Sequence, residues 1–265
     1  MNPDVFVDYV QLRDPYKGGM NGRLSAHPAL VVAPHPDDDV IGAGGAMAVM
    51  AAGGIDVFSL FVTGGGSPVL GGEGDAAVRR QESLDALDVV DACGAFFLDY
   101  ASAQLFDDSA TVTASLKAVF DRLRPGIVYL PAPFERHRTH VRVTALTLAA
   151  LLALSNCRPQ LWGYQVWGSW WGTEGVKTVD ISSVVDVKQA AVQRHQSQLR
   201  FKAFDEGMLG RNRYEAVFAE THAPDQAHSV ERFLDMSGLL DDPSLSLKVF
   251  AEKVVREWLS SLHLP

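Results

Sequence analysis

Short, continuous apolar runs alternate with longer segments whose apolar residues recur at helical spacing. The runs predict buried strands at 28–33, 55–62, 95–98 and 126–130, and the longer segments predict helices at 44–52, 76–93, 109–123 and 139–154. Gly53-Gly54, Gly94 and Pro125 mark the expected ends of three of these helices. Because strand and helix alternate, we expect an α/β fold, a Rossmann-like three-layer sandwich with a mostly parallel sheet.

The pattern changes after Gln160. It predicts strands at 161–167 and 176–181 and a helix at 184–198, and then helical segments at 226–240 and 244–262. Prolines and glycines interrupt any regular period in the first 26 residues. We therefore predict an N-terminal extension (1–26), an α/β domain (27–222) and a C-terminal helical appendage (223–265).

Composition narrows the class of protein. The chain has 265 residues, 47% of them hydrophobic, and a formal net charge of −9 with a pI near 5.3. Such a chain can bury a sizeable core, and its acidity argues against binding nucleic acid or an anionic membrane. Its two cysteines, Cys93 and Cys157, form no CxxC pair and are expected to be buried thiols.

Nothing in the pattern predicts a membrane segment. The most apolar run, 143–154, is too short to cross a bilayer. Residues 1–14 carry acids, and no basic region followed by an apolar run, so they do not resemble a signal peptide. We therefore expect a cytoplasmic protein without a membrane span.

Candidate chemistry begins directly after the first predicted strand. His35 is followed closely by the carboxylates Asp37, Asp38 and Asp39. Three adjacent acids past a buried strand repel one another unless a cation lies nearby, and a divalent metal is the simplest such cation. The alternative is that the acids only cap a helix.

A second charged cluster, Glu135 to His140, follows the strand predicted at 126–130. Loops that follow parallel strands lie at the same edge of a sheet, so both clusters should meet there. His35 and Asp38 can then share one ion with the imidazoles of the second cluster. A His/Asp/His set leaves coordination positions open, as catalytic zinc sites do.

The glycines favour no nucleotide site. Gly42-Ala43-Gly44-Gly45 is a weak dinucleotide-type signal, and the three aspartates before it would repel a pyrophosphate. The glycine-rich segment 64–74 lacks the GK[ST] ending of a P-loop. We interpret it as a loop near the site.

These motifs resemble the zinc-dependent de-N-acetylases of the PIG-L/LmbE family over about residues 28 to 220. The first cluster is similar to that family's H-P-D-D-E signature, and His137-Arg138-Thr139-His140 to its H-P-D-H motif. Weaker similarities follow the family's R-x-x-E, K-x(6)-H-x-S-Q and Y-x-E-x-F patterns, at Arg79 and Glu82, at Lys188, His195, Ser197 and Gln198, and at Tyr214, Glu215 and Phe218.

The resemblance implies a role for each matching residue. His35, Asp38 and His140 would bind Zn²⁺, or Fe²⁺ or another divalent metal. Asp37 would be the general base, and His137 would stabilise the oxyanion and protonate the leaving amine.

Two further residues are candidate substrate contacts. Arg79 would be a substrate clamp, unless it only pairs with Glu82 on a helix surface. Asp39, which stands where the family has glutamate, is the second.

The second motif departs from the family pattern at two positions. Arg138 replaces the proline, and Thr139 replaces the aspartate that would orient and charge His137. Either Glu135 takes the place of this acid, or His137 is a weaker catalyst here.

The sequence thus predicts a metal-dependent hydrolase that removes an N-acyl group, most simply acetyl, from an amino sugar or a glycoconjugate. Its partners would be a small-molecule or glycoconjugate substrate and further copies of itself, because the apolar run at 143–154, the tryptophans and the C-terminal helical appendage together exceed what one core needs. The alternatives are a non-haem Fe(II) oxygenase, which also uses two histidines and one carboxylate, and a sugar-binding member that has lost catalysis.

Overall fold

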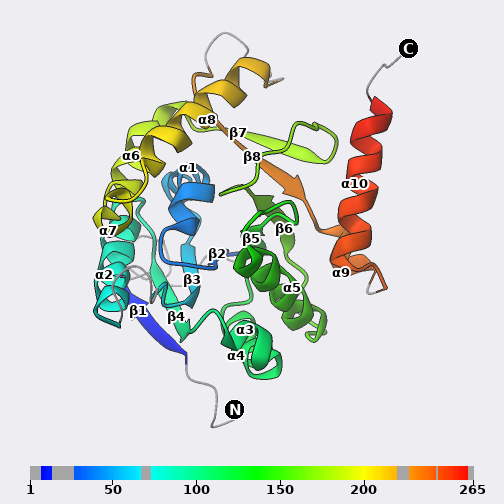
Figure 1. Ribbon diagram of the computed structural model, residues 1–265, viewed down its shortest axis with the longest axis horizontal. Coiled ribbons are helices and arrows are strands. Elements are labelled where there is room, and N and C mark those ends of the chain that lie inside the picture. The colour runs from blue at the N-terminus through cyan, green and yellow to red at the C-terminus, as the bar shows by residue number, and fades with distance from the viewer. Residues whose placement is uncertain (1–6, 14–26, 67–72, 220–226, 243, 262–265) are drawn as a thin grey trace.

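The computed structural model describes residues 7–13, 27–66, 73–219, 227–242 and 244–261. They form an eight-stranded sheet in the order β1-β4-β3-β2-β5-β6-β8-β7 (Figure 1). Its strands are β1 (Asp8–Gln11), β2 (Ala29–Ala33), β3 (Val57–Thr63), β4 (Gly94–Tyr100), β5 (Ile127–Pro131), β6 (Gln160–Tyr164), β7 (Val176–Asp180) and β8 (Val230–Asp235). Neighbours from β4 to β6 are parallel, which confirms the predicted fold class.

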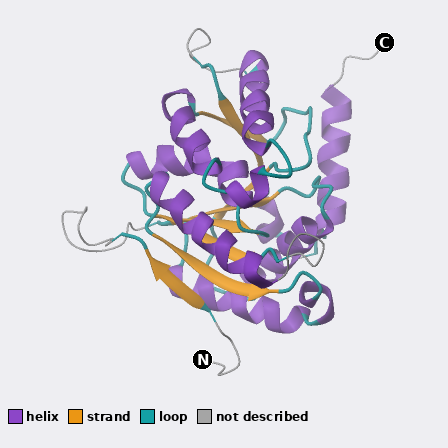
Figure 2. Cartoon of the chain, turned by 60° about the vertical axis from the view of Figure 1, so that its left-hand side comes forward, coloured by secondary structure: helices purple, strands orange, loops and turns teal. Residues whose placement is uncertain are grey.

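Helices cover both faces of the sheet (Figure 2). One core contains residues of α1 (Asp38–Ala52), α2 (Glu73–Val89), α6 (Val185–Val192) and α8 (Phe204–Phe218), and α7 (Gln196–Leu199) lies beside α2. The other contains residues of α3 (Gln104–Asp107), α4 (Ser109–Leu123), α5 (Arg138–Leu152), α9 (Gly238–Asp241) and α10 (Leu247–Ser261). Alternate residues of β2 enter opposite cores, since Leu30 packs in the second and Val31 in the first.

The strand order places two loops at one crevice. β2 pairs with β3 on one side and with β5 on the other, both in parallel. After β2 the chain adds β3 and β4 on one side of this strand and then returns to add β5 on the other side. The loops after β2 and β5 flank this switch point, where open α/β sheets bind ligands.

Helix α1 begins at Asp38, six residues before the predicted start at Gly44. The glycines do not interrupt it; they allow close packing. A Cβ on Gly42 would lie 2.3 Å from the Tyr164 ring, and one on Gly45 would lie 2.6 Å from Ile181. The acids of the first turn interact favourably with the positive end of the helix dipole.

The helix predicted at 226–240 is wrong over most of its length. Residues 230–235 form β8, which pairs with β6 and β7, both antiparallel. The strand is buried on both faces, so its apolar residues show no clean alternation and mimic helical spacing.

Two other elements also differ from expectation. Residues 8–11 of the predicted extension form β1 at the sheet edge, and the helix predicted at 184–198 is divided into α6 and α7. The predicted appendage (223–265) contains β8 of the sheet together with α9 and α10, and the three-part division of the chain stays a prediction.

A buried ion pair joins β8 to the helix layer. Glu231 accepts hydrogen bonds from the backbone N–H groups of Gly45 (2.9 Å) and Ala46 (2.7 Å) in α1. It also accepts one from Lys188 Nζ of α6 at 2.5 Å, and both side chains are almost fully buried. This carboxylate therefore holds α1 and α6 together from the strand beneath them.

Candidate metal and catalytic site

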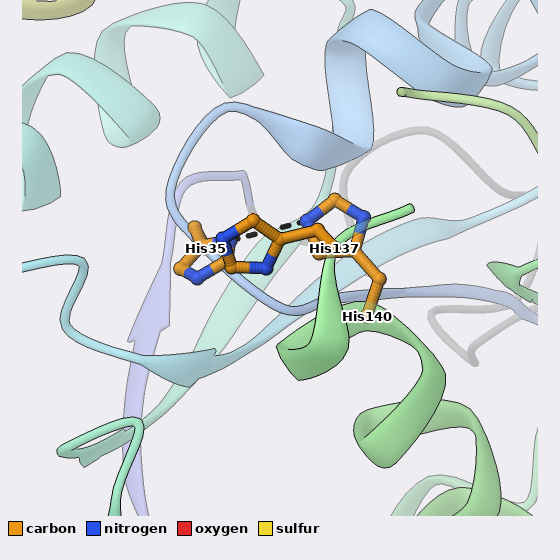
Figure 3. Close-up of side chains that lie close together, drawn as sticks. All are labelled: His35, His137 and His140. Carbon is orange, nitrogen blue, oxygen red and sulfur yellow. Dashed lines mark hydrogen bonds between the residues drawn. The ribbon is translucent and has the colours of Figure 1, made fainter. Parts of the chain in front are cut away.

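Three side chains from two loops meet at the carboxyl edge of β2 and β5. His35 follows β2, Asp38 begins α1, and His140 lies in the first turn of α5. Oδ2 of Asp38 lies 2.9 Å from Nδ1 of His35 and 3.1 Å from Nε2 of His140. The two ring nitrogens are 3.3 Å apart, as the dashed line in Figure 3 marks. The structure thus brings together the ligand set predicted from the sequence.

His137 stands at the outer side of this group. It is the residue before α5, its side chain is exposed, and its ring centroid lies 5.0 Å from that of His35 and 4.9 Å from that of His140 (Figure 3). Ligand atoms of the three histidines all lie within 4.8 Å of one another. Two candidate ligand sets therefore exist, and both contain His35 and His140. The third ligand is Asp38 in one set and His137 in the other, and the donor atoms of the set with Asp38 lie closer together.

Asp37 has an unusual backbone that other groups hold in place. Its φ is 127°, a value that side-chain-bearing residues rarely adopt. Arg79 of α2 donates hydrogen bonds to the carbonyl of Pro36 (2.7 Å) and to Oδ2 of Asp37 (3.2 Å), and a further one to the carbonyl of Gly65 (2.6 Å). Arg79 is 6% exposed, and its guanidinium fixes both the turn and the Asp37 carboxylate.

This contact speaks against a pair of Arg79 with Glu82, while the role of Arg79 as a substrate clamp stays a prediction. Its carboxylate partner is Asp37, whereas Glu82 accepts hydrogen bonds from the backbone N–H and the hydroxyl of Ser197 (2.7 and 2.6 Å). The R-x-x-E and H-x-S-Q segments therefore meet in space and brace α2 against α7.

Glu135 is tied to His140 and not to His137. Its Oε2 lies 3.2 Å from Nδ1 of His140. The same carboxylate accepts hydrogen bonds from the backbone N–H groups of Val166 (2.6 Å) and Trp167 (3.0 Å). Glu135 thus orients a candidate ligand, and the suggestion that it replaces the missing acid beside His137 is not supported.

The negative charges of Asp38 and Glu135 and the positive charge of His140 stabilise one another. Burial opposes a charge on His140, but Asp38 and Glu135 outweigh it and raise the pKa of His140 to about 10. Burial likewise opposes ionisation of Asp38, yet His140 and His35 hold the pKa of Asp38 well below its usual range. The pair of carboxylates around His140 is therefore suited to a cation.

The two proposed catalytic groups have shifted pKa values as well. Burial and the neighbouring Asp38 carboxylate raise the pKa of Asp37 well above its ordinary value. Partial loss of solvent around its ring, together with the nearby His35 and His140 rings, lowers the pKa of His137. Groups with shifted pKa values in a cleft are typical of functional sites.

The group opens into a cavity of about 640 Å³. Trp167 forms part of its wall, 39% exposed, with its ring stacked at 6.4 Å on that of His137, and Phe204 packs edge-on against it at 5.6 Å. The cavity is lined by His35, Asp37, Asp38, Ile41, Gly65, Gly66, Arg79, Ala101, Ser102, Ala103, His137, Thr139, Val166, Trp167, Gln198 and Phe204. Trp162, Trp170 and Trp171, which lie near Trp167 in the chain, are not among these lining residues.

Asp39 is not brought to the cavity. It is 1% exposed, and Ser59 donates a 2.7 Å hydrogen bond to its Oδ2 from β3. Its side chain therefore points into the sheet, and the substrate contact assigned to it has no place on the cavity wall.

His195 lies behind Arg79. It is 2% exposed, and within the described part of the chain neither ring nitrogen has a hydrogen-bond partner. The sequence signalled this residue only through the weak H-x-S-Q similarity. Trp167 belongs to none of the motifs found in the sequence and lies only in a segment, 162–171, that contains four tryptophans.

The donor set fits a divalent metal. Ligands at the 2.0–2.1 Å bond lengths of tetrahedral zinc lie about 3.3 Å apart, close to the separations of His35, Asp38 and His140. One carboxylate and two imidazoles suit zinc and also iron or other divalent ions. A carboxylate on the second nitrogen of His140 is the usual outer partner of a metal-bound histidine.

A family model and a relative that are similar to this chain are both described as deacetylases. The family model described as GlcNAc-PI de-N-acetylase, PIG-L, matches residues 30–151, which contain both charged loops. The diacetylchitobiose deacetylase of Thermococcus kodakarensis is 29% identical over 187 residues, which cover 64% of this chain and 69% of that protein.

Solved structures share the fold. The conserved protein TT1542 from Thermus thermophilus superposes with a TM-score of 0.65 at 25% identity, over 79% of this chain and 94% of that one. The N,N'-diacetylchitobiose deacetylase from Pyrococcus horikoshii gives a TM-score of 0.62 at 23% identity, over 88% and 89% of the two chains. No helix in the described residues is both long and apolar enough to cross a membrane.

Proposed function

We propose that this chain is a member of the PIG-L/LmbE family of de-N-acetylases, and that it is a metal-dependent hydrolase that removes an N-acyl group, most simply acetyl, from an amino sugar or glycoconjugate. The observation that carries the proposal is the convergence of His35, Asp38 and His140 within 3.3 Å, with Asp37 and His137 beside them on the cavity wall. The substrate class follows the relatives' activities.

In the proposed mechanism, His35, Asp38 and His140 hold the metal, zinc in the first instance. When bound, such a metal supplies a water whose pKa is lowered to about 7. Asp37 removes a proton from the attacking water, and Arg79 keeps its carboxylate directed at the cavity. His137 stabilises the developing oxyanion and donates a proton to the leaving nitrogen, because an amine leaves poorly without one.

The placement of these groups favours a hydrolase over the iron oxygenase considered above. The candidate ligands lie in the loop after β2 and in the first turns of α1 and α5, at the edge of an open, mostly parallel sheet, and not on the strands of a small barrel. A member that binds sugars without catalysis would need no strained, arginine-held Asp37, so that backbone supports turnover. Self-association and a cytoplasmic location remain predictions.

The proposal is tested by turnover of a simple N-acetylglucosamine derivative. The full chain is stripped with a chelator, reloaded with Zn²⁺, and assayed for the free amine and for acetate. We expect equal amounts of both products from the reloaded protein and a near-complete loss in the stripped sample. Absence of both products with zinc, iron and manganese alike would overturn the proposal.

A further inference from the structure

The side chain of His137 is exposed and is held by ring contacts alone. In the described part of the chain its imidazole contacts three aromatic rings, one of them that of Trp167, and forms no hydrogen bond. The buried carboxylate of Glu135 lies against His140 instead, and position 139 is a threonine. A proton donor has to point at the leaving group, so a contact other than a hydrogen bond must fix the direction of this ring.

Trp167 is the one of these three rings that lies outside the proposed ligand set. Its ring stacks on that of His137, with the centroids 6.4 Å apart and the planes 25° from parallel. The Trp167 ring is itself held by two neighbours. Phe204 packs edge-on against it at 5.6 Å, and Nζ of Lys202 lies 4.1 Å from its centroid. It therefore forms a fixed, flat support that limits rotation of the imidazole.

Two opposite charges hold the backbone of the loop 165–168, which carries Trp167. The loop follows β6, so it lies at the same edge of the sheet as the loops after β2 and β5. Glu135 accepts hydrogen bonds from three successive N–H groups of the loop, at 2.6, 3.0 and 3.4 Å. Arg211 of α8 donates hydrogen bonds to two of its carbonyl groups, at 3.1 and 3.2 Å. The negative side chain thus binds the donors of the loop, and the positive one binds its acceptors.

Arg211 reaches the cavity only through this loop. It is partly buried and is not among the residues that line the cavity. Burial lowers the pKa of its guanidinium, and the nearby carboxylates of Glu231 and Glu135 oppose that shift. An arginine stays charged at neutral pH, and its rigid fork of donors suits two consecutive carbonyl groups better than a flexible ammonium does.

We propose that Trp167 orients the imidazole of His137 in place of a hydrogen bond, and that Arg211 is a positioning residue that fixes Trp167 through the loop 165–168. The proposal rests on the function proposed above, in which His137 is the proton donor. It gives a residue outside the cavity an effect on the chemical step. Loss of Arg211 should therefore lower kcat and leave KM almost unchanged, because the guanidinium does not touch the substrate.

A double-mutant cycle between Arg211 and Trp167 tests the connection on the zinc-loaded full chain, with the N-acetylglucosamine derivative as substrate. Arg211→Met should lower kcat about 10-fold, since small misplacements of a catalytic group are costly. Arg211→Lys, which keeps the charge and loses the fork, should lower it less. In the Trp167→Ala background, Arg211→Met should change kcat by less than about twofold, because both substitutions remove the same support.

Matched controls come from the same parts of the chain. Arg213→Met removes an exposed arginine from α8, two residues from Arg211. Trp171→Ala removes a tryptophan that is exposed and does not line the cavity. Both variants should keep the parental kcat.

A second experiment supplies the missing hydrogen bond. Thr139→Asp introduces a carboxylate two residues from His137, where it can orient the imidazole directly. In this background Trp167→Ala should lower kcat less than it does in the parent. A defect of folding would not be relieved in this way, so the rescue separates positioning from a general structural role.

Fluorine NMR gives a readout that needs no turnover. The chain has five tryptophans, and labelling with 5-fluorotryptophan gives each its own resonance, with Trp167→Phe identifying that of Trp167. In Arg211→Met this resonance should shift or broaden more than those of the remaining tryptophans, which show that the variant is folded. In Arg213→Met it should stay unchanged.

Each contrary outcome has its own meaning. Equal losses from Arg211→Met in the parent and in Trp167→Ala, or a Trp167 resonance that Arg211→Met does not change, overturn the role of Arg211. A loss from Trp167→Ala that Thr139→Asp does not reduce overturns the role of Trp167. The parent is active in all these cases, so the proposed function stands. Absence of turnover in the parent overturns the proposed function, and this inference with it.

Discussion

The carboxylate of Glu135 lies 3.2 Å from Nδ1 of His140, the ring whose other nitrogen faces Asp38 and His35. It also accepts hydrogen bonds from the backbone of Val166 and Trp167. One buried side chain therefore sets the direction of a proposed metal ligand and anchors the loop that forms the cavity wall.

Glu135→Gln should weaken metal binding about 10- to 100-fold, the usual cost of losing the outer partner of a ligating histidine. Competition with a chromogenic chelator measures this affinity. Glu252→Gln, a change of the same kind on exposed α10, is the control. Unchanged affinity in Glu135→Gln would show that His140 needs no such partner.

Removal of single donors distinguishes the two possible ligand sets. We expect His35→Ala, Asp38→Ala and His140→Ala to lose the metal, because each donor atom lies within 3.3 Å of the other two. His137→Ala should keep it. Metal content is measured by plasma emission on the purified proteins. A full equivalent in Asp38→Ala together with loss in His137→Ala would instead assign the site to the three histidines.

Asp37→Asn and His137→Ala should retain the metal and lose activity. General acid and base groups typically contribute 10²- to 10⁴-fold, so each variant should lose about that much in kcat. Steady-state assays of the zinc-loaded proteins measure the loss. Near-parental kcat in either variant would show that another group transfers the proton.

The pH profile should report His137. Partial loss of solvent around the ring, with the nearby His35 and His140 rings, lowers the pKa of His137 from its ordinary 6.5. A general acid must be protonated, so activity should fall as the pH rises through this lowered pKa. Thr139→Asp should move the falling limb to higher pH by stabilising the imidazolium. A limb that does not move in Thr139→Asp and persists in His137→Ala belongs to a different acid.

His195 should make stability depend on pH. Burial, and then the charge of Arg79, lowers the pKa of His195 from 6.5 to about 3. Below about pH 6.5 the unfolded chain binds a proton here that the folded chain does not, so folding loses up to about 1.4 kcal/mol per pH unit as the pH falls. The loss is complete only near pH 3, where the folded imidazole also takes up its proton.

Urea unfolding of the metal-free protein between pH 7.5 and 5 measures this slope. His195→Asn should reduce this slope by the part that His195 contributes. The comparison with the parent protein is needed because other groups have the opposite effect on stability, such as Asp39, whose pKa burial raises to about 6. His228→Asn, which removes an exposed imidazole, is the control. Identical slopes in His195→Asn and the parent would contradict the prediction.

The elements that the sequence predicted well are those whose pattern is local. The helix at 109–123 matches α4, and the strand at 28–33 matches β2, because one buried face or one apolar run defines each. The meeting of His35 and Asp38 with His140 also followed from the sequence, since parallel strands bring their following loops to one edge.

The remaining features depend on contacts between distant residues. The hydrogen bond of Arg79 to Asp37 spans 42 residues, and Glu135 reaches the 166–168 loop from 31 to 33 residues away. No local period encodes such pairs. The apolar run at 143–154, which suggested self-association, is largely buried in the core of this one chain, so that prediction loses part of its basis.

Glu231 is synthesised after all the residues described above that it holds in place. Every proposed ligand and catalytic group has been synthesised once the ribosome has added His140. At that point the N–H groups of Gly45 and Ala46 still lack their buried acceptor, and Lys188, when it follows, has no counter-charge until β8 arrives. The helix that presents Asp38 is therefore held by Glu231 only late in translation, and a fragment that ends soon after His140 contains the proposed ligands and catalytic groups without the buried carboxylate that supports α1.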